Sequence, residues 1–530
     1  MQPAVDPNSS RGCPRQAATL AGAGKFPGLA WWLPDVGLAV SILTLFYCLL
    51  VYDGSRRLFR DSDSGWHIRT GEAILAGAGF PRADPYSFSR AGEPWFAWEW
   101  AADVSMGIAH RMAGLWGVAL LYAVAIAAAT WLWFQLHWAA GGNFFIACLL
   151  ASPMLSTVNL HWLARPHVIG WLFLLGAILY LETAAGRGRL RRQAPAIVLF
   201  CALWANFHAS FFLAPLLALV HAAGCLLGPM IWDLDRAAEW RRARWFAGAA
   251  ALAALASLLN PYGWRLHQHL FAYLTNRELL QRVAEFQSFN FHAPGTFQIL
   301  VVVAVAAVGG VLALGQRKLA QALLTAGLLA LALRSARGLP VAALALLPLA
   351  NGAITEALRN WRDPRPALGK RLDAFLAYSD RLRALDCGRN GWAAALVALV
   401  LAFLWLQSPA VAARAGFPPD EFPVEAAAAV EKLPPDARLL APDKFGGYLI
   451  YRFAGRRKVF FDGRSDFYGS DFMKQYVRLV EVRPGWKEQV DAWKFTHALL
   501  PTDYSLAAGL EQAGWRRIWR DPTAVLLERK

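Results

Sequence analysis

The sequence predicts a mainly α-helical membrane protein: a polytopic helical bundle followed by a small C-terminal α/β domain outside the cytoplasm. Three observations carry this prediction. Of 530 residues, 57% are hydrophobic and only 17% are charged, which excludes an ordinary soluble enzyme. The 24 Trp residues suit membrane–water interfaces. Apolar stretches long enough to cross about 30 Å of hydrocarbon recur between residues 34 and 407.

The apolar stretches divide the chain. Residues 1–30 contain Pro and Gly, have no apolar core segment and are expected to form a disordered cytoplasmic tail. Residues 31–408 form the expected membrane domain, with residues 52–114 as its first external loop. We predict about eleven spans, at 34–52, 115–137, 144–160, 167–185, 194–206, 210–231, 246–260, 297–314, 319–333, 338–357 and 391–407.

The formal net charge of +16 comes from short basic clusters between apolar stretches. A nucleic-acid-binding protein would gather this charge on one face, so nucleic acid is not an expected partner, whereas the lipid bilayer is. With the N-terminus in the cytoplasm, every strong cluster falls on the cytoplasmic side, as the positive-inside rule requires. The clusters lie at 11–25, 187–192, 236–244, 317–318 and 359–389.

After the last predicted span the composition changes. Residues 409–423 form a Pro/Ala-rich linker, and residues 424–530 resemble a soluble α/β domain. We expect helices near 424–433, 471–482 and 506–513, strands at 437–440, 458–461 and 498–500, and a hairpin of 516–519 with 524–528. The polar stretch 462–469 follows a strand directly, and we favour a docking or acceptor-positioning role for it.

The most informative polar segment follows the first span. In an extended chain, Asp61 and Asp63 would project from the same edge. They could hold a divalent cation, Mg²⁺ or Mn²⁺, or one could steer an acceptor while the other removes its proton. An Asp-X-Asp pair in a loop is also typical of a solvated turn. Its position just outside a span, with His67 and Arg69 close behind, favours function, and we take His67 as a further catalytic candidate and Arg69 as a candidate substrate ligand.

Further along the first loop, carboxylates alternate with aromatic residues. Asp84, Trp98 and Glu99 are candidate ligands of a sugar, because sugar rings pack on aromatic faces and their hydroxyls need acceptors. The alternative for the aromatic residues is a helix lying among the lipid headgroups. A carboxylate in so apolar a run needs a partner, which makes Glu99 the stronger candidate.

Later outer connectors supply more candidates for substrate binding. Arginines at this depth suit a phosphate or pyrophosphate, although they could also extend to the interface without a ligand. A single His is more often a packed residue, but the accumulation on one face favours a site. The segment 260–286 is expected to be a lid or an interfacial helix beside it. The candidates are His161, Arg165, His167, Asn206, His208, Tyr262, Glu285, Arg334 and Arg337.

These residues also carry a resemblance. Around Asp63, Trp66, His67 and Arg69, and again at 84–87, 204–208, 260–263, 285–286 and 458–464, the chain resembles bacterial polytopic proteins related to the GT-C class of membrane glycosyltransferases. The resemblance implies a GT-C-like bundle in the bacterial inner membrane, a polyprenyl-(pyro)phosphate sugar donor, and Asp63, with or without Asp61, as the first-loop carboxylate that acts as base or acceptor ligand. Where several members carry a second acidic motif, this chain has His161, Arg165 and His167 instead.

The function predicted from these features is an inverting transfer of a sugar from a polyprenyl-linked donor to a glycan, lipid or protein acceptor. Asp63 would take the proton of the acceptor hydroxyl, and Arg165, Arg334 or Arg337 would stabilise the departing phosphate. The alternative is a non-enzymatic transporter or flippase of lipid-linked glycans, or an assembly component of the cell envelope. A transporter would place ionisable groups along the whole path, whereas the inner halves of the predicted spans look bare.

Overall fold

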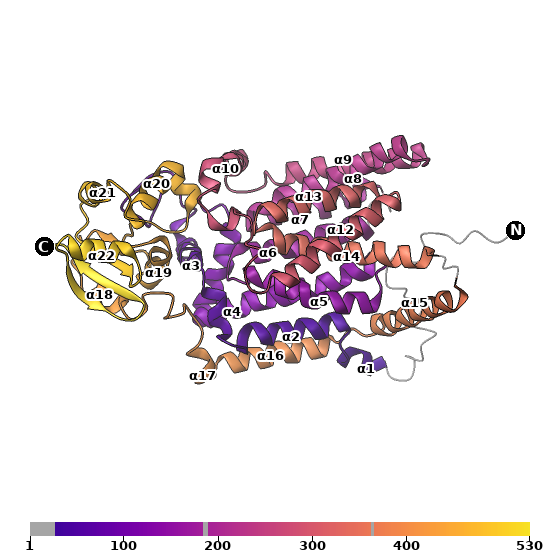
Figure 1. The fold of residues 1–530 in the computed structure, drawn as a ribbon, viewed down its shortest axis with the longest axis horizontal. Coiled ribbons are helices and arrows are strands. Elements are labelled where there is room, and N and C mark those ends of the chain that lie inside the picture. Colours follow the sequence, from indigo (N-terminus) through magenta and orange to yellow (C-terminus); the bar gives the residue numbers. More distant parts are fainter. Residues whose placement is uncertain (1–26, 184–188, 362–364) are drawn as a thin grey trace.

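The structure, a computed structural model, describes residues 27–183, 189–361 and 365–530. Its long helices lie side by side in a bundle, and a smaller unit with a sheet caps one end of that bundle (Figure 1). The predicted fold class, a mainly α membrane bundle with a small C-terminal α/β unit, is confirmed. The predicted tail, residues 1–30, lies outside the described residues except for the start of α1 (Pro27–Trp32).

Each of the eleven predicted spans coincides with a helix, but not every helix qualifies as a span. Among the described residues, seven helices are long and apolar enough to cross a membrane, or eight if the bent pair α15 and α16 counts as one. The chain is therefore a multi-pass membrane protein, with fewer qualifying spans than the eleven predicted. The helices are α2 (Val36–Leu50), α4 (Trp100–Ala139), α5 (Phe144–Val158), α6 (Pro166–Thr183), α7 (Leu190–Phe207), α8 (Leu213–Ile231), α9 (Arg236–Ala256), α12 (Thr296–Gly315), α13 (Leu319–Arg334), α14 (Gly338–Asn360), α15 (Pro366–Cys387) and α16 (Trp392–Leu406).

Basic residues and length explain the helices that fall short. Helix α7 opens with Arg191 and Arg192, α9 carries Arg241 to Arg244 in its first turns, and α13 has only 16 residues. Helix α15 and the start of α9 lie at the end of the bundle away from the C-terminal unit (Figure 1). The basic residues on these elements thus gather at the end opposite the sheet.

Short elements fill the end of the bundle where the C-terminal unit sits (Figure 1). The first external loop is largely folded, and α4 begins inside it. Gly114, at φ 62°, interrupts α4 where the second span was predicted to start. The short elements are η3 (Gly54–Phe59), α3 (Asp63–Ala73), η4 (Ile74–Ala78), η5 (Asn159–His161), η6 (Ala209–Phe212), α10 (Trp264–Thr275), α11 (Arg277–Leu280) and η7 (Ala284–Phe286).

The C-terminal unit is built on a four-stranded sheet in the order β1-β2-β4-β3. Strand β1 is parallel to β2, while β4 is antiparallel to both β2 and β3. The helix α19 was not predicted, and the division of the chain into domains stays a prediction. The elements are α17 (Pro409–Ala412), α18 (Ala427–Glu431), β1 (Leu439–Leu440), α19 (Asp443–Arg452), α20 (Ser465–Val480), α21 (Trp486–Ala492), β2 (His497–Pro501), α22 (Ser505–Gln512), β3 (Arg516–Arg520) and β4 (Ala524–Glu528).

The predicted strand at 458–461 is wrong as a member of this sheet. Its backbone pairs instead with the first external loop, in a parallel bridge between Ser87 and Val459. The N–H of Phe88 donates to the carbonyl of Val459 at 3.0 Å, and the N–H of Val459 donates to the carbonyl of Tyr86 at 3.0 Å. The apolar pattern was right, but the partner is a segment far earlier in the chain.

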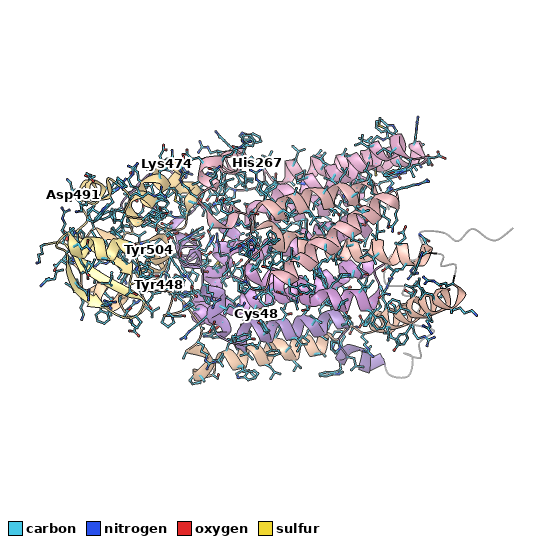
Figure 2. The ribbon with its side chains drawn as sticks, in the orientation of Figure 1. Cys48, His267, Tyr448, Lys474, Asp491 and Tyr504 are labelled. Carbon is cyan, nitrogen blue, oxygen red and sulfur yellow. The ribbon has the colours of Figure 1, made fainter. Side chains whose placement is uncertain are left out.

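Helix α19 docks on α3 through glycines. A Cβ atom on Gly65 would lie 2.4 Å from the carbonyl oxygen of Gly447, and one on Gly447 would lie 2.7 Å from the Cβ of Ser62. Such distances are possible only without side chains, so the two backbones touch. Tyr448 of α19, labelled in Figure 2, lies where the C-terminal unit meets the bundle and packs on Phe417 at 5.3 Å between ring centroids. The C-terminal unit is thus held directly against the segment that carries Asp63.

Candidate active site

Three carboxylates from two separate segments converge on one guanidinium. Arg165 Nη1 lies 2.7 Å from Asp61 Oδ2 and 3.2 Å from Glu285 Oε1, and Arg165 Nη2 lies 2.8 Å from Asp63 Oδ2. The other oxygen of Glu285 lies 2.8 Å from Nε of Arg337. Glu285 thereby links the two arginines. The one-sided clustering expected from the sequence brings these five side chains into a single ion-pair cluster.

Local structure positions the first two carboxylates. Asp63 is the first residue of α3, and its N–H donates to Oδ1 of Asp61 at 2.8 Å. The two residues therefore occupy a helix start, rather than the extended chain that the spacing suggested. Arg165 stands directly before Pro166, the first residue of α6, where the fixed φ of proline suits the first helical position. Two helix starts thus face each other across the cluster.

The turn between α13 and α14 supplies Arg337. The carbonyl of Glu285 accepts from Oγ of Ser335 at 2.9 Å and from the N–H of Arg337 at 3.2 Å. These bonds fix Glu285 beside the turn. Arg334, the other candidate from this turn, is exposed and has no ion pair with any described residue. The structure therefore separates the two arginines that the sequence could not distinguish.

A second polar group lies around Glu99. Its Oε1 is 3.4 Å from Nε2 of His208, and its Oε2 is 3.9 Å from Nε2 of His67. The other ring nitrogen of His67 contacts Asp103 Oδ1 at 2.5 Å, and that of His208 contacts Ser210 Oγ at 2.7 Å. Glu99 and Asp103 are four residues apart at the start of α4, so both face α3. The result is a chain of hydrogen-bonding groups that runs beside the ion-pair cluster.

Burial and charge tune these groups in opposite directions. Burial raises the pKa of Asp63, and the neighbouring guanidinium opposes this rise. Burial also raises the pKa of Glu99, to about 7. Burial alone would raise the pKa of Glu285, but the guanidinium groups of the two arginines lower it below its usual range. Burial lowers the pKa of His67 and brings that of His208 to about 3, so both imidazoles are neutral.

Other predicted ligands frame the two groups. His167 Nε2 contacts the carbonyl oxygen of His161 at 2.9 Å in the turn before α6. The side chain of Asn206 connects two segments: it accepts a hydrogen bond from Nε1 of Trp100 at 2.6 Å and donates one to the carbonyl of Leu259 at 2.8 Å.

The aromatic candidates pack beside α10. The ring of Tyr262 lies 4.6 Å from that of Phe96, and Trp98 lies 5.5 Å from the imidazole of His269. Helix α10 buries Leu266 and Leu270 and exposes aromatic side chains on its other side. A helix with one buried and one exposed apolar face therefore lies beside the site, and its role as a lid or an interfacial helix stays a prediction.

Two predicted ligands are engaged in docking. Asp84 Oδ1 lies 2.8 Å from Nη1 of Arg464, and both side chains are buried. Arg69 donates from Nε to the carbonyl of Tyr451 at 2.8 Å and pairs with Glu72 at 2.5 Å. The structure thus places Asp84 and Arg69 in contacts with the C-terminal unit, which the sequence favoured only for the stretch around Arg464.

Two residues of the site were not predicted. Asp103 could have been found, because it is a lone carboxylate in an apolar helix, which is a signal of function in a membrane segment. Gly463 could not. A Cβ atom on Gly463 would lie 1.9 Å from Asp63 Oδ1, so the C-terminal unit covers that carboxylate with bare backbone. Only the folded chain brings positions 63 and 463 together.

The half of the bundle away from the C-terminal unit, predicted to be the inner half, carries more polar residues than the sequence suggested. His221 of α8 lies 3.5 Å from Glu182 at the end of α6, and Gln321 of α13 donates to the same carboxylate at 3.2 Å. The expectation of empty inner halves is therefore corrected.

The cluster does not fit the divalent cation expected at Asp61 and Asp63. The oxygens that would coordinate Mg²⁺ or Mn²⁺ already contact Arg165 at hydrogen-bond distances. Over residues 27–183, 189–361 and 365–530, no three His, Cys, Asp or Glu side chains are arranged to hold a metal ion.

The chain matches no protein-family model and no curated protein. Among solved structures, the apo oligosaccharyltransferase of Archaeoglobus fulgidus aligns with 90% of this chain and 70% of its own length, at 12% identity and a TM-score of 0.50. AglB from the same organism, with an inhibitory peptide and dolichol-phosphate, aligns with 91% of this chain and 70% of its own, at 11% identity and a TM-score of 0.52. ArnT from Cupriavidus metallidurans, bound to undecaprenyl phosphate, covers 96% and 98% at 14% identity with a TM-score of 0.46.

Identities this low show the fold alone, and the two oligosaccharyltransferase structures carry the comparison. The resemblance to the GT-C class suggested by the sequence is confirmed at the level of the fold: this chain has the architecture of the archaeal oligosaccharyltransferase.

Proposed function

We propose that this chain is an integral-membrane glycosyltransferase of the bacterial inner membrane. It transfers a sugar from a polyprenyl-phosphate or polyprenyl-pyrophosphate to a glycan, lipid or protein acceptor outside the cytoplasm. The observation that carries the proposal is the convergence of Asp63, Arg165 and Arg337 at the outer end of the bundle. A buried carboxylate beside two guanidinium groups offers a base and an anion site in one place. The N-terminus would be cytoplasmic and the C-terminal unit extracytoplasmic.

The proposed transfer is a single displacement with inversion. The acceptor oxygen forms a bond to the anomeric carbon as the bond from that carbon to the phosphate oxygen breaks. The acceptor proton passes to Asp63, and the phosphate leaves with the bonding electron pair. Asp63 Oδ2 is held by Arg165, and Oδ1 lies against Gly463, so the acceptor hydroxyl would reach Oδ1 beside the Gly463 backbone, where no side chain stands in the way. Arg337 contacts Glu285 through Nε, which leaves its terminal amino groups for the phosphate.

The Glu99 group would bind the sugar. A carboxylate between two neutral imidazoles presents acceptors and donors together, as a ring with several hydroxyls requires. The pKa of about 7 lets Glu99 accept or share a proton near neutral pH. Trp98 lies in the same segment and offers an aromatic face for the ring. These contacts support a role of Glu99 in substrate binding, which the sequence also favoured.

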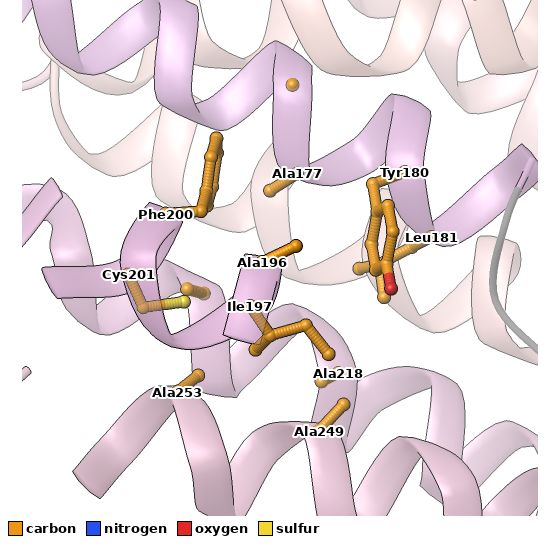
Figure 3. A pocket seen from close by; sticks show the side chains of 12 residues that line it. Ala177, Tyr180, Leu181, Ala196, Ile197, Phe200, Cys201, Ala218, Ala249 and Ala253 are labelled. Carbon is orange, nitrogen blue, oxygen red and sulfur yellow. The ribbon is translucent and has the colours of Figure 1, made fainter. Parts of the chain in front are cut away.

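An apolar cavity offers room for part of the lipid tail (Figure 3). It has a volume of about 270 Å³ and lies between α6, α7, α8 and α9, where Ile197, Phe200 and Ala218 line it. Along α6, Ala177 of the cavity lies about 15 Å from His167 beside the site, at 1.5 Å per residue. A polyprenyl chain whose phosphate rests on the arginines would extend inward over this distance.

Filling the cavity is expected to discriminate against long donors. The Ala218→Phe variant places a ring in the apolar space without touching the polar groups. We expect KM for a long-chain donor to rise about tenfold, because roughly 1.4 kcal/mol of apolar contact is lost, and KM for a one- or two-isoprene donor to stay unchanged. Initial rates with both donors measure this. If KM rises equally for both donors, the lipid tail does not lie in this cavity.

The two arginines of one turn provide a matched test of phosphate binding. We expect Arg337→Ala to lower kcat/KM about 10- to 100-fold, since a hydrogen bond to a charged group contributes about 1.5–3 kcal/mol. Arg334→Ala should have a much smaller effect, because Arg334 is exposed outside the ion-pair cluster. Steady-state kinetics on the two variants checks the order. Equal losses would argue against a specific phosphate contact at Arg337.

The decisive experiment is transfer itself. The purified protein in nanodiscs is incubated with radiolabelled polyprenyl-phosphate sugars and a lysate of its own source, and the label is followed into glycan, lipid or protein. Label in a macromolecule that depends on Asp63 supports the proposal. If every donor stays intact while labelled lipid crosses the bilayer of proteoliposomes, the chain is a transporter instead. The inner Glu182–His221 pair is the feature that a transporter would use.

A further inference from the structure

Arg165 is surrounded as a metal ion would be. Its guanidinium receives Asp61 and Asp63 from the first external loop and Glu285 from a loop 120 residues away from Arg165 in the chain. Three carboxylates repel one another when brought together, so a positive charge must stand between them. Arginine stays charged at every physiological pH. The fold therefore carries its own permanent cation at the centre of this cluster.

The spacing of the carboxylates suits a guanidinium and not a divalent ion. Oxygens bound to Mg²⁺ lie about 2.0–2.1 Å from the metal and close to one another. Here they lie 2.7, 2.8 and 3.2 Å from two different nitrogens of a planar group. A metal ion could enter only if Arg165 left. Moving the guanidinium of Arg165 away would cost free energy, because the buried carboxylates would be left without a positive partner.

A second guanidinium completes the charge. Glu285 bridges Arg165 and Arg337, with one oxygen on each. The pair brings two positive charges to one place, which is the formal charge of one divalent cation. A phosphate leaving group that develops charge beside this pair would be stabilised as it would be beside a metal ion.

We propose that Arg165, with Arg337 beside it, replaces the divalent cation in this site, so that Asp61, Asp63 and Glu285 hold a guanidinium and transfer proceeds without metal. This inference rests on the proposed function only where activity is measured. Arg165 acts as a binding group for the donor phosphate and positions Asp63. Removing its side chain should turn the three carboxylates into a site for a metal ion.

Mn²⁺ binding tests the inference without an activity assay. Wild-type protein in nanodiscs, Arg165→Ala, Arg165→Met and Arg334→Ala are titrated with Mn²⁺, and free Mn²⁺ is followed by electron paramagnetic resonance. We expect no specific site in the wild type or in Arg334→Ala, and at least tenfold tighter binding in Arg165→Ala. Adding Asp61→Asn to Arg165→Ala should abolish that binding. Arg165→Met keeps most of the side-chain volume, so it serves if the alanine variant does not fold.

The metal dependence of transfer is the second test of the inference. Wild-type transfer should keep its rate after dialysis against EDTA, and Mn²⁺ should not raise it. Stoichiometric Mn²⁺ binding by the wild type that is lost in Asp61→Asn would overturn the inference, as would loss of transfer in EDTA with recovery on adding Mn²⁺. Failure of the wild type to transfer any sugar would instead overturn the proposed function, and the binding result would still stand.

Discussion

Asp63→Asn is expected to lower kcat by about 100- to 10,000-fold, the range that general-base catalysis contributes. The amide has the shape of the carboxylate but cannot take a proton from the acceptor. The fold should survive, because Arg165 keeps its contacts with Asp61 and Glu285. Transfer of labelled sugar measures the loss, and thermal unfolding in detergent checks that the variant is folded. Full activity of this variant would refute the role of Asp63.

Asp61→Asn is the matched control, because Asp61 contacts the same guanidinium at 2.7 Å. If Asp63 only holds Arg165, the two variants lose similar activity. If Asp63 is the base, Asp63→Asn loses much more activity than Asp61→Asn. The kcat/KM of the wild type should then rise with pH, and this rise should occur at a higher pH than for an ordinary aspartate, whose pKa is about 4. Activity rises with pH because the base acts only when it is ionised, and the rise moves to higher pH because burial raises the pKa of Asp63.

Composition was enough to predict the bundle, because the constraint is local to each segment. A helix must bury about 20 apolar residues in hydrocarbon, and that requirement can be read from the chain without knowing its neighbours. The count of spans was less secure, since α13 with 16 residues is apolar but short. The strand predicted at 458–461 failed for another reason: its apolar pattern is real, but pairing with Ser87 is a long-range choice.

The site shows the same difference between local features, which the sequence predicts, and long-range pairings, which it does not. The sequence placed Asp63, Arg165 and Arg337 on one face through topology alone, and the structure joins them through Glu285. What topology could not give was which polar residue pairs with which. Asp84 was expected near a sugar because it lies in a loop rich in carboxylates, but its partner, Arg464, comes from the far end of the chain. Burial decides such pairings, and burial is set by the whole fold.

Arg464→Met is expected to destabilise the contact of the C-terminal unit with the bundle by about 3–5 kcal/mol, the cost of breaking a buried ion pair from one side. Arg464 is 2% exposed and contacts Asp84 at 2.8 Å and Asp462 at 2.7 Å. Its guanidinium also lies 4.7 Å from the ring centre of Trp95. Methionine fills similar space but leaves both carboxylates without a positive charge. Limited proteolysis should release the C-terminal unit from the variant and not from the wild type.

The double variant Arg464→Met/Asp84→Asn separates charge from packing. Its second substitution removes one of the two unpaired charges, and the amide oxygen, placed where Oδ2 of Asp84 lies in the wild type, can still accept from the N–H and the hydroxyl of Ser87. The double variant should therefore recover part of the stability that the single variant loses. No recovery would mean that the packing of Arg464 on Trp95 holds the interface. Because Gly463 lies against Asp63, a C-terminal unit that detaches should also uncover the carboxylate and slow transfer, which ties the stability of this contact to activity.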